Sequence, residues 1–233
     1  MKRIGFILLL ALISNILSAQ FGISGRYTKN TNKAWSDVYQ DVSGDENTLF
    51  SSGIELGVNY WFRLKNYRVE FLPEITYATS KTDIRLSQVM LESHEKQSYH
   101  FNFNIQIYPL DFEGDCDCPT WSKDGNLIKK GFYWLFSPGI VQHTIATTPS
   151  AISSVFPEDS KMTSFRLGVG AGLDIGITDL FTVSPFAMYS INPSNEWASQ
   201  VDLYQIYPVT IEKATINQWH AGIRLIFRPN YKG

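Results

Sequence analysis

The chain of 233 residues is rich in aromatic side chains and poor in charge. Aromatic residues make up 14% of it and charged residues 18%, against roughly 25% charged residues in typical soluble domains. The hydrophobic content of 44% excludes intrinsic disorder, and beyond residue 20 no apolar run approaches the ~20 residues of a membrane helix. The formal charge of -2 excludes a strongly basic nucleic-acid-binding protein, so we expect no nucleic acid among the partners.

The first 19 residues have the pattern of a secretory signal peptide. Lys2 and Arg3 precede an apolar run, and small residues end it at Ala19, which is the usual order of such signals. An uncleaved membrane anchor is the alternative, but Ser14 and Asn15 interrupt the apolar run. We therefore expect residues 1–19 to be a signal peptide and residues 20–233 to form a single exported domain.

Four segments of the exported part alternate apolar and polar residues with a period of two, which predicts β-strands. In the first of them, Ile54, Leu56 and Val58 share one face, while Glu55 and Asn59 lie on the other. The four segments are 53–62, 99–108, 165–176 and 219–228. Weaker alternation at 20–28, 67–79, 131–143 and 180–190 raises the total to eight strands.

The connections between the predicted strands alternate in length. The turns at 64–66 and 177–179 are short, and most of the others are about twenty residues long. These long connections are 29–48, 80–98, 144–163 and 191–214. Short turns at one rim and long loops at the other are typical of outer-membrane barrels. The connection 109–130 is an exception, because it is long where the pattern requires a short periplasmic turn.

The charged residues on the polar faces determine which face of each strand contacts lipid and which face is turned toward the lumen. An arginine turned toward lipid near the bilayer midplane costs ~2–4 kcal/mol, whereas paired charges are tolerated in a lumen. We therefore predict an all-β fold, an eight-stranded antiparallel transmembrane up-and-down barrel over 20–233 whose apolar face contacts lipid.

Pro73, Pro138 and Pro185 fall within three predicted strands. Proline lacks the backbone N–H that a strand donates to its neighbour, and a closed barrel has no edge strand to accommodate that loss. All three prolines occupy strands that run toward the long loops. We therefore predict a local β-bulge at each of them.

The signal peptide, the eight amphipathic strands and the loop asymmetry resemble small outer-membrane β-barrel proteins of Gram-negative bacteria. Within that group, the "SAQ" at 18–20, the Ser-Pro pairs at 137–138 and 184–185, and "HAGIRLIFRP" at 220–229 are similar to the PorT-type family. The resemblance covers nearly all of the exported part. It implies a barrel fold and an outer-membrane location, and it adds a role as an accessory of secretion or motility as one alternative.

Charged residues of the polar faces form the first candidate site. They are Glu55, Arg68, Glu70, Glu74, Arg166, Asp174 and Arg224, accompanied by His100 and His220. Eight strands leave an interior just wide enough for side chains, so we interpret these residues as a network of paired charges that fills the lumen. The alternative is the selective lining of a small channel.

Two other candidates lie in connections. Cys116 and Cys118 stand in 109–130, and export into an oxidising compartment favours a disulfide, with a periplasmic docking loop as the alternative. Their spacing, with no CxxC partner and no nearby histidine, does not suit zinc, and the acidic residues around them do not match a calcium loop, so we expect no metal. In the last long connection, Trp197, Tyr204 and Tyr207 form a candidate partner-binding surface, unless they pack against one another.

Catalysis requires a nucleophile, a base and an orienting group. His94 and His143 are the only histidines near the predicted outer loops, and neither stands in a recognisable Ser/His/Asp pattern. We expect no catalytic residue and no cofactor. The sequence favours a structural or partner-binding barrel that contacts outer-membrane lipid and a protein partner, at its extracellular loops or at 109–130. A small channel is the main alternative, followed by a lipid-modifying enzyme that depends on His143.

Overall fold

The computed structural model describes the barrel strands and part of their connections. The described residues are 20–31, 36, 50–64, 67–86, 90–112, 127–148, 160–178, 180–195 and 214–227. The predicted signal peptide, both cysteines and the predicted partner-binding residues Trp197, Tyr204 and Tyr207 lie outside these ranges.

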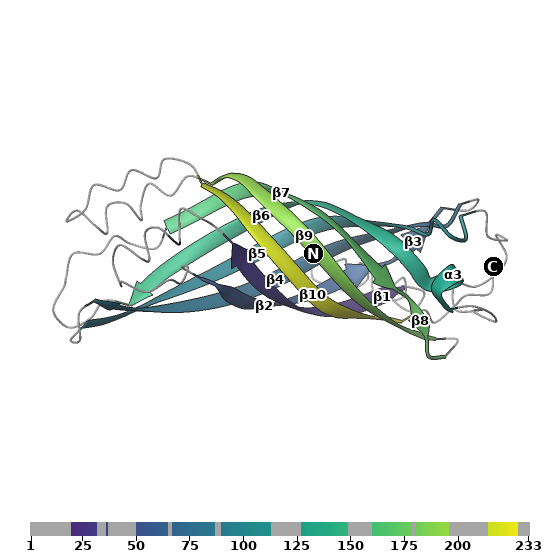
Figure 1. Ribbon diagram of the computed structural model, residues 1–233, viewed down its shortest axis with the longest axis horizontal. Helices are drawn as coiled ribbons and strands as arrows, with labels where there is room; N and C mark the ends of the chain where they lie inside the picture. The colour runs from purple at the N-terminus through teal and green to yellow at the C-terminus, as the bar shows by residue number, and fades with distance from the viewer. Residues whose placement is uncertain are drawn as a thin grey trace, which may run out of the picture.

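The strands form one closed antiparallel sheet (Figure 1). In chain order they are β1 (Phe21–Thr31), β2 (Ser52–Tyr60), β3 (Phe62–Arg63), β4 (Val69–Leu86), β5 (Met90–Ile107), β6 (Phe132–Thr148), β7 (Ser160–Leu173), β8 (Ile175–Gly176), β9 (Phe181–Asn195) and β10 (Ala214–Phe227). Both β2 and β3 pair with β4, and both β7 and β8 pair with β9; the other strands pair with their neighbours along the chain, and β1 pairs with β10 to close the barrel. Because β3 continues β2 and β8 continues β7 in the same register, the wall has eight strands. The predicted fold class is confirmed.

The two faces of each strand differ in chemistry as the alternation predicts. In β2, the outward side chains of Ile54, Leu56 and Val58 are 59%, 61% and 61% exposed. The inward side chains of Glu55 and Asn59 are 1% and 2% exposed. The molecule therefore has an apolar exterior and a polar interior, which is the reverse of a water-soluble barrel.

Aromatic rings gather on the exterior at two levels. Near the rim where β1 begins and β10 ends, Phe21 and Phe181 both pack against Phe227, with ring centroids 5.4 and 5.1 Å apart. Farther up the wall, Tyr189 packs against Trp219 at 4.9 Å. Strands that rise about 3.3 Å per residue and tilt by about 40° place these two levels roughly 20 Å apart. Aromatic girdles at this spacing are typical of the two interfaces of a membrane.

Above the upper girdle, the outward residues of β1, β4, β5, β6 and β7 become polar, whereas Ile191 of β9 remains apolar. Lys29, Thr79, Gln97, Gln142 and Thr163 are the next outward positions in their strands, and each of them is exposed or half-exposed. We call the rim near Phe21 and Phe227 the terminal rim and the opposite end the loop rim. We call this change from apolar to polar outward residues the polar switch, and it marks the upper limit of the apolar band.

The predicted connection at 80–98 is wrong, because this segment is an extended hairpin. β4 and β5 pair without interruption from Val69↔Ile107 to Leu86↔Met90, whereas β2 pairs with β4 only up to Thr79. The hairpin reaches past β1, β9 and β10 at the loop rim (Figure 1). Similarly, β6 continues to Thr148, so the predicted connection at 144–163 is shorter than expected. The alternation of apolar and polar residues stops at Tyr99, where β5 leaves the apolar band. The sequence pattern therefore did not predict the part of the hairpin beyond that residue.

The bulges predicted at the three prolines are also wrong. The only register shift recorded among the described strand pairs lies between Ala214 and Ile216. At each proline the register continues but the ladder to one neighbour is interrupted. By that register, the residues opposite Pro73, Pro138 and Pro185 across the gaps are Tyr60, Phe103 and Leu173. The missing proline N–H therefore interrupts the ladder to one neighbouring strand over two residue pairs, but it does not shift the register.

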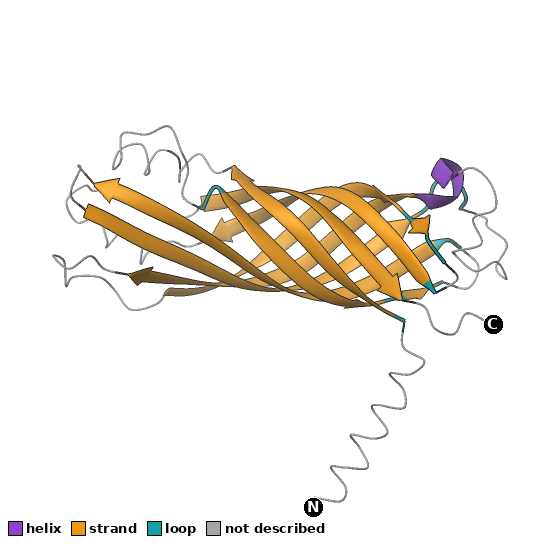
Figure 2. Cartoon of the chain, turned by 90° about the horizontal axis from the view of Figure 1, so that it is seen from below, coloured by secondary structure: helices purple, strands orange, loops and turns teal. Residues whose placement is uncertain are grey.

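The short helix α3 (Leu127–Gly131) precedes β6 at the terminal rim (Figure 2). It occupies the end of the predicted long connection 109–130. Among the described residues, no helix is long and apolar enough to cross a membrane.

Candidate functional site

The polar interior is the candidate site, because it gathers most of the buried charge of the molecule. Inward positions of β1, β2, β4, β5, β7 and β10 supply most of it, since their side chains alternate with the lipid-facing ones. All seven predicted residues lie there, each 8% exposed or less. The contacts divide them into a central cluster, a lower cluster near the terminal rim, and one arginine beside the central cluster that has no recorded ion pair among the described residues.

Arg26 holds two carboxylates in the central cluster. Its Nε atom lies 3.0 Å from Glu55 Oε2, and one of its terminal nitrogens lies 2.5 Å from Glu74 Oε2. Ser24 and Asn104 donate further hydrogen bonds to Glu74, at 2.5 and 3.0 Å. A buried charge is tolerated only when it is paired and hydrogen-bonded, and Glu74 meets both conditions.

Arg166 extends the central cluster across the lumen. Its guanidinium lies 3.8 Å from Glu55 Oε2 and contacts ring nitrogens of His100 at 2.5 Å and of His220 at 2.7 Å. His220 in turn lies 3.7 Å from the other oxygen of Glu55. Glu55 therefore sits between Arg26, Arg166 and His220, and these contacts tie together β1, β2, β5, β7 and β10.

The lower cluster is built around two carboxylates and one tyrosine. The Tyr108 hydroxyl lies 2.7 Å from Asp174 Oδ2 and 3.1 Å from Glu70 Oε2. The Trp61 indole donates to the same Glu70 oxygen at 2.5 Å. At the rim itself, Arg68 forms an ion pair with Asp111, stacks 4.4 Å from the centre of the Tyr108 ring and donates to the Lys130 carbonyl. These contacts close the lumen at its terminal end.

Arg224 lies beside the central cluster, where it interacts electrostatically with Glu74 and shares the Phe186 ring with Arg26. It is fully buried, and its guanidinium lies 5.1 Å from the centre of the Phe186 ring. Among the described residues, no side chain or backbone group forms a hydrogen bond with any of its three nitrogens. Within the described part of the chain, ion pairs are recorded for four of the seven predicted residues, Glu55, Arg68, Glu74 and Arg166. Glu70 and Asp174 accept hydrogen bonds from Tyr108, and Arg224 lies against an aromatic ring.

His143, which the sequence put at the end of the predicted strand 131–143 near an outer loop, lies within β6 and points into the lumen. Its exposure is 1%, and its Nδ1 atom lies 2.6 Å from the Ser98 hydroxyl. The cavity beside this pair is about 10 Å³ and is lined by Lys96, His100 and Glu55 among others. That volume is about the size needed for one water molecule, which leaves no room for a lipid substrate. His94 lies in β5.

Sequence reasoning missed several interior residues. Arg26 lies on the inward face of β1, and the alternation at 20–28 was sufficient to predict this. Tyr108 already stood on the polar face of the segment 99–108, but it was not singled out as a site residue, and Tyr133 lies in 131–143, where apolar residues occupy both faces; both are fully buried, with ring centroids 5.7 Å apart. Among the described residues, no group of three or more metal-binding side chains is placed to hold an ion.

No protein-family model matches the chain, and no curated protein matches it. The PorT-type resemblance therefore stays a prediction. Several solved structures align with most of the chain at low identity. The Ail protein of Yersinia pestis, in complex with a heparin analogue, is 14% identical with a TM-score of 0.43, covering 90% of this chain and 99% of that one. Neisserial surface protein A is 11% identical with a TM-score of 0.45, covering 89% and 96%. The N-terminal β-barrel domain of Pseudomonas aeruginosa OprF is 14% identical with a TM-score of 0.32, covering 90% and 98%.

Proposed function

We propose that the protein is an integral outer-membrane barrel that works as a non-enzymatic binding scaffold, with a closed interior and a partner-binding surface at its loop rim. The observation that carries this proposal is the inverted chemistry of the wall. Its apolar band, limited by two aromatic girdles, suits lipid, and most of its interior charges form ion pairs or hydrogen bonds inside the lumen.

The closed interior argues against the channel alternative. Arg26, Arg166 and His220 converge on Glu55 in the middle of the lumen, and Tyr108 joins two carboxylates below it. An ion crossing the lumen would have to displace these contacts one after another. A plugged barrel supports the membrane or binds partners, and it does not need to conduct.

The projecting β4–β5 hairpin supports a binding role. From Ser80 to Leu86 and from Met90 to Gln97 its strands lie beyond the polar switch, where the membrane no longer requires them. Beyond Thr79 no strand pairs with the outer edge of β4 among the described residues, so this edge can offer its backbone groups to a partner. The loop 196–212, with Trp197, Tyr204 and Tyr207, is the second candidate surface.

Location is tested by fractionation of cells that express the full chain. We expect the protein in the outer-membrane fraction, with an electrophoretic mobility that changes on heating because the folded barrel resists detergent. A soluble periplasmic monomer without such a shift would contradict the proposal.

The binding surface is tested by trimming the hairpin in register. Ser80 and Lys96 are paired residues, so 81–95 can be replaced by an Asn-Gly turn without moving the rest of the ladder. We expect a partner cross-linked on intact cells to be lost on this deletion, or on deletion of 196–212, while the heat-dependent mobility shift remains. A partner that survives both deletions would place binding elsewhere, for instance at 109–130.

A further inference from the structure

A groove crosses the outer wall of the barrel. Its volume is about 1350 Å³, and it passes over β7, β9, β10, β1 and β2. Its floor lies where the outward side chains are short, in the row of laterally paired residues Ala171↔Ala187↔Ala221. Longer apolar side chains, among them Leu56, Ile223 and Leu225, form its lining.

The groove lies within the apolar band. Next to Ala187 and Ala221, on the side of the loop rim, stands the ring pair of Tyr189 and Trp219. A hollow in a surface that faces lipid forfeits dispersion contacts unless something flexible and apolar fills it. An acyl chain has that shape and that chemistry.

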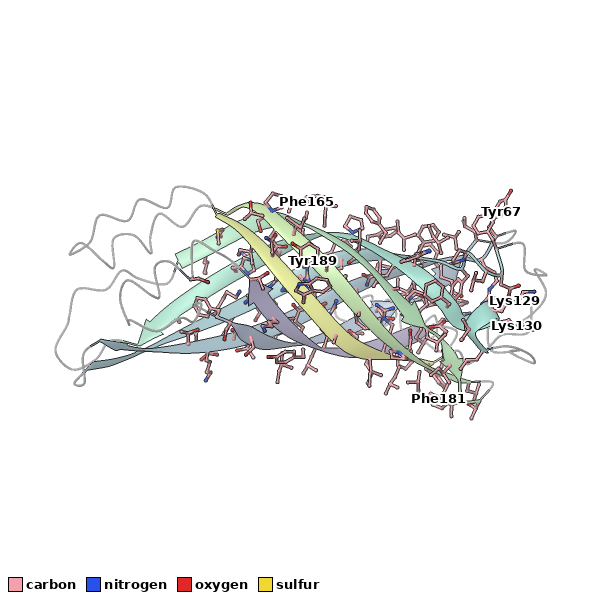
Figure 3. The ribbon with its side chains drawn as sticks, viewed as in Figure 1. Tyr67, Lys129, Lys130, Phe165, Phe181 and Tyr189 are labelled. Atoms are coloured by element: carbon pink, nitrogen blue, oxygen red, sulfur yellow. The ribbon has the colours of Figure 1, made fainter. Side chains whose placement is uncertain are left out.

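The groove ends at cationic residues on the terminal rim. Ile128 of α3 lines the groove and is 61% exposed, and Lys129 and Lys130 follow it directly in the chain. Figure 3 shows both lysines at the same end of the barrel as Phe181 and Tyr67. Cations at this level lie where the phosphates of one membrane leaflet are, and each Lys near a membrane surface attracts anionic lipid.

We propose that this groove is a binding site for an anionic glycerophospholipid of the periplasmic leaflet. One acyl chain lies along Ala171, Ala187 and Ala221, and the phosphate contacts Lys129 and Lys130. The proposal rests on the outer-membrane location proposed above, because that location supplies both the lipid and its orientation.

The test is native mass spectrometry of the full-length protein, purified in detergent and supplied with phosphatidylglycerol or phosphatidylethanolamine. We expect the wild type to retain one phosphatidylglycerol in preference to phosphatidylethanolamine. Lys129→Gln/Lys130→Gln should weaken retention roughly fivefold per lysine. Ala187→Phe/Ala221→Phe should abolish it by filling the floor, and Ala171→Phe provides a second filling variant in case that one does not fold.

Matched controls use the parts of the wall outside the groove. Ile75→Phe enlarges a side chain on β4 that is 66% exposed, and Lys81→Gln/Lys161→Gln removes two exposed charges at the loop rim. Both should retain lipid as the wild type does.

Three results would overturn the proposal: equal retention by wild type and groove-filling variants, loss in the lysine variant alone, or a wild-type dimer that the filling variants convert to monomers. The last would make the groove an interface between copies. Loss of the heat-dependent mobility shift in the same wild-type samples would instead contradict the outer-membrane proposal itself, so the two failures are distinguishable.

Discussion

At the scale of single residues, Glu55 is the centre of the interior. It is 1% exposed and lies between Arg26 and Arg166. Glu55→Gln removes the charge that both guanidinium groups share, and breaking a buried pair in this way costs about 3–5 kcal/mol. We expect the urea midpoint of the barrel, refolded in lipid vesicles, to fall accordingly.

The control for this change is Glu95→Gln, in the projecting part of β5. Glu95 is paired with Lys81 at 3.3 Å, but both side chains are accessible to water, and exposed pairs contribute little. Equal losses of stability in the two variants would contradict the role given to Glu55.

The Glu95 carboxylate also predicts a dependence on pH outside the membrane band. A hydrogen bond from Gln97 and contacts with Lys81 hold the pKa of Glu95 below its ordinary value of 4.5. Because the folded pKa is the lower one, the stabilisation is present above pH 4.5 and is lost as the pH falls through the folded pKa. We expect the carboxyl ¹³C signal of Glu95 to titrate with a midpoint below pH 4.5 in the wild type. In Gln97→Ala, which lacks the hydrogen bond, this midpoint should rise toward 4.5. A midpoint at or above that value in the wild type would contradict the hairpin contacts.

At the scale of strands, glycines of β7 give the interior room for larger side chains. A Cβ at Gly170 would lie 2.2 Å from the Ala187 carbonyl oxygen, whereas one at the outward Gly25 would meet only Leu56 at 3.7 Å. Gly170→Ala should therefore lower the unfolding free energy by about 1–3 kcal/mol. Gly25→Ala should leave it nearly unchanged, and urea unfolding of both variants compares them. Similar stability of the two variants would contradict this prediction, because it would show that the strands near Gly170 shift to accommodate a Cβ atom.

The prolines provide a second test at this scale. Pro138 faces Phe103 across the gap between β5 and β6, and the register on both sides of the gap agrees. Pro138→Val supplies the missing N–H, so we expect a new amide that exchanges slowly with solvent and a gain of about 1 kcal/mol. Hydrogen exchange followed by NMR in detergent measures the amide. Rapid exchange at position 138 would mean that the strands are too far apart there to pair.

Period-two alternation was sufficient to predict the strands within the apolar band, because there each residue faces either lipid or lumen. It failed from Ser80 to Leu86 and from Met90 to Gln97, where the sequence is mostly polar and only short stretches contain apolar residues. It also predicted the inward direction of Glu55 and Arg166, but not their partners, since pairing depends on the shear of the closed barrel. The alternation in β1 predicts that Arg26 faces inward, but no feature of the neighbouring sequence identifies Glu55 and Glu74 as its ion-pair partners.

At the scale of the whole molecule, the paired interior predicts the absence of conduction. The wild-type protein in planar bilayers should show no unit conductance, because the contacts of Glu55 and Tyr108 close the lumen at two levels. Discrete current steps that change in Glu55→Gln or Arg166→Gln would favour the channel alternative.

The central claim is that one face of the wall contacts lipid while the other encloses a closed interior. Spin labels at successive positions from 54 to 60 test it most directly, in a Cys116→Ser/Cys118→Ser background reconstituted in vesicles. We predict high accessibility to molecular oxygen, which concentrates in lipid, at Ile54, Leu56, Val58 and Tyr60. At Glu55, Gly57 and Asn59 we predict low accessibility both to oxygen and to a water-soluble nickel reagent. Nickel accessibility at these inward positions, or oxygen accessibility without alternation, would contradict the account.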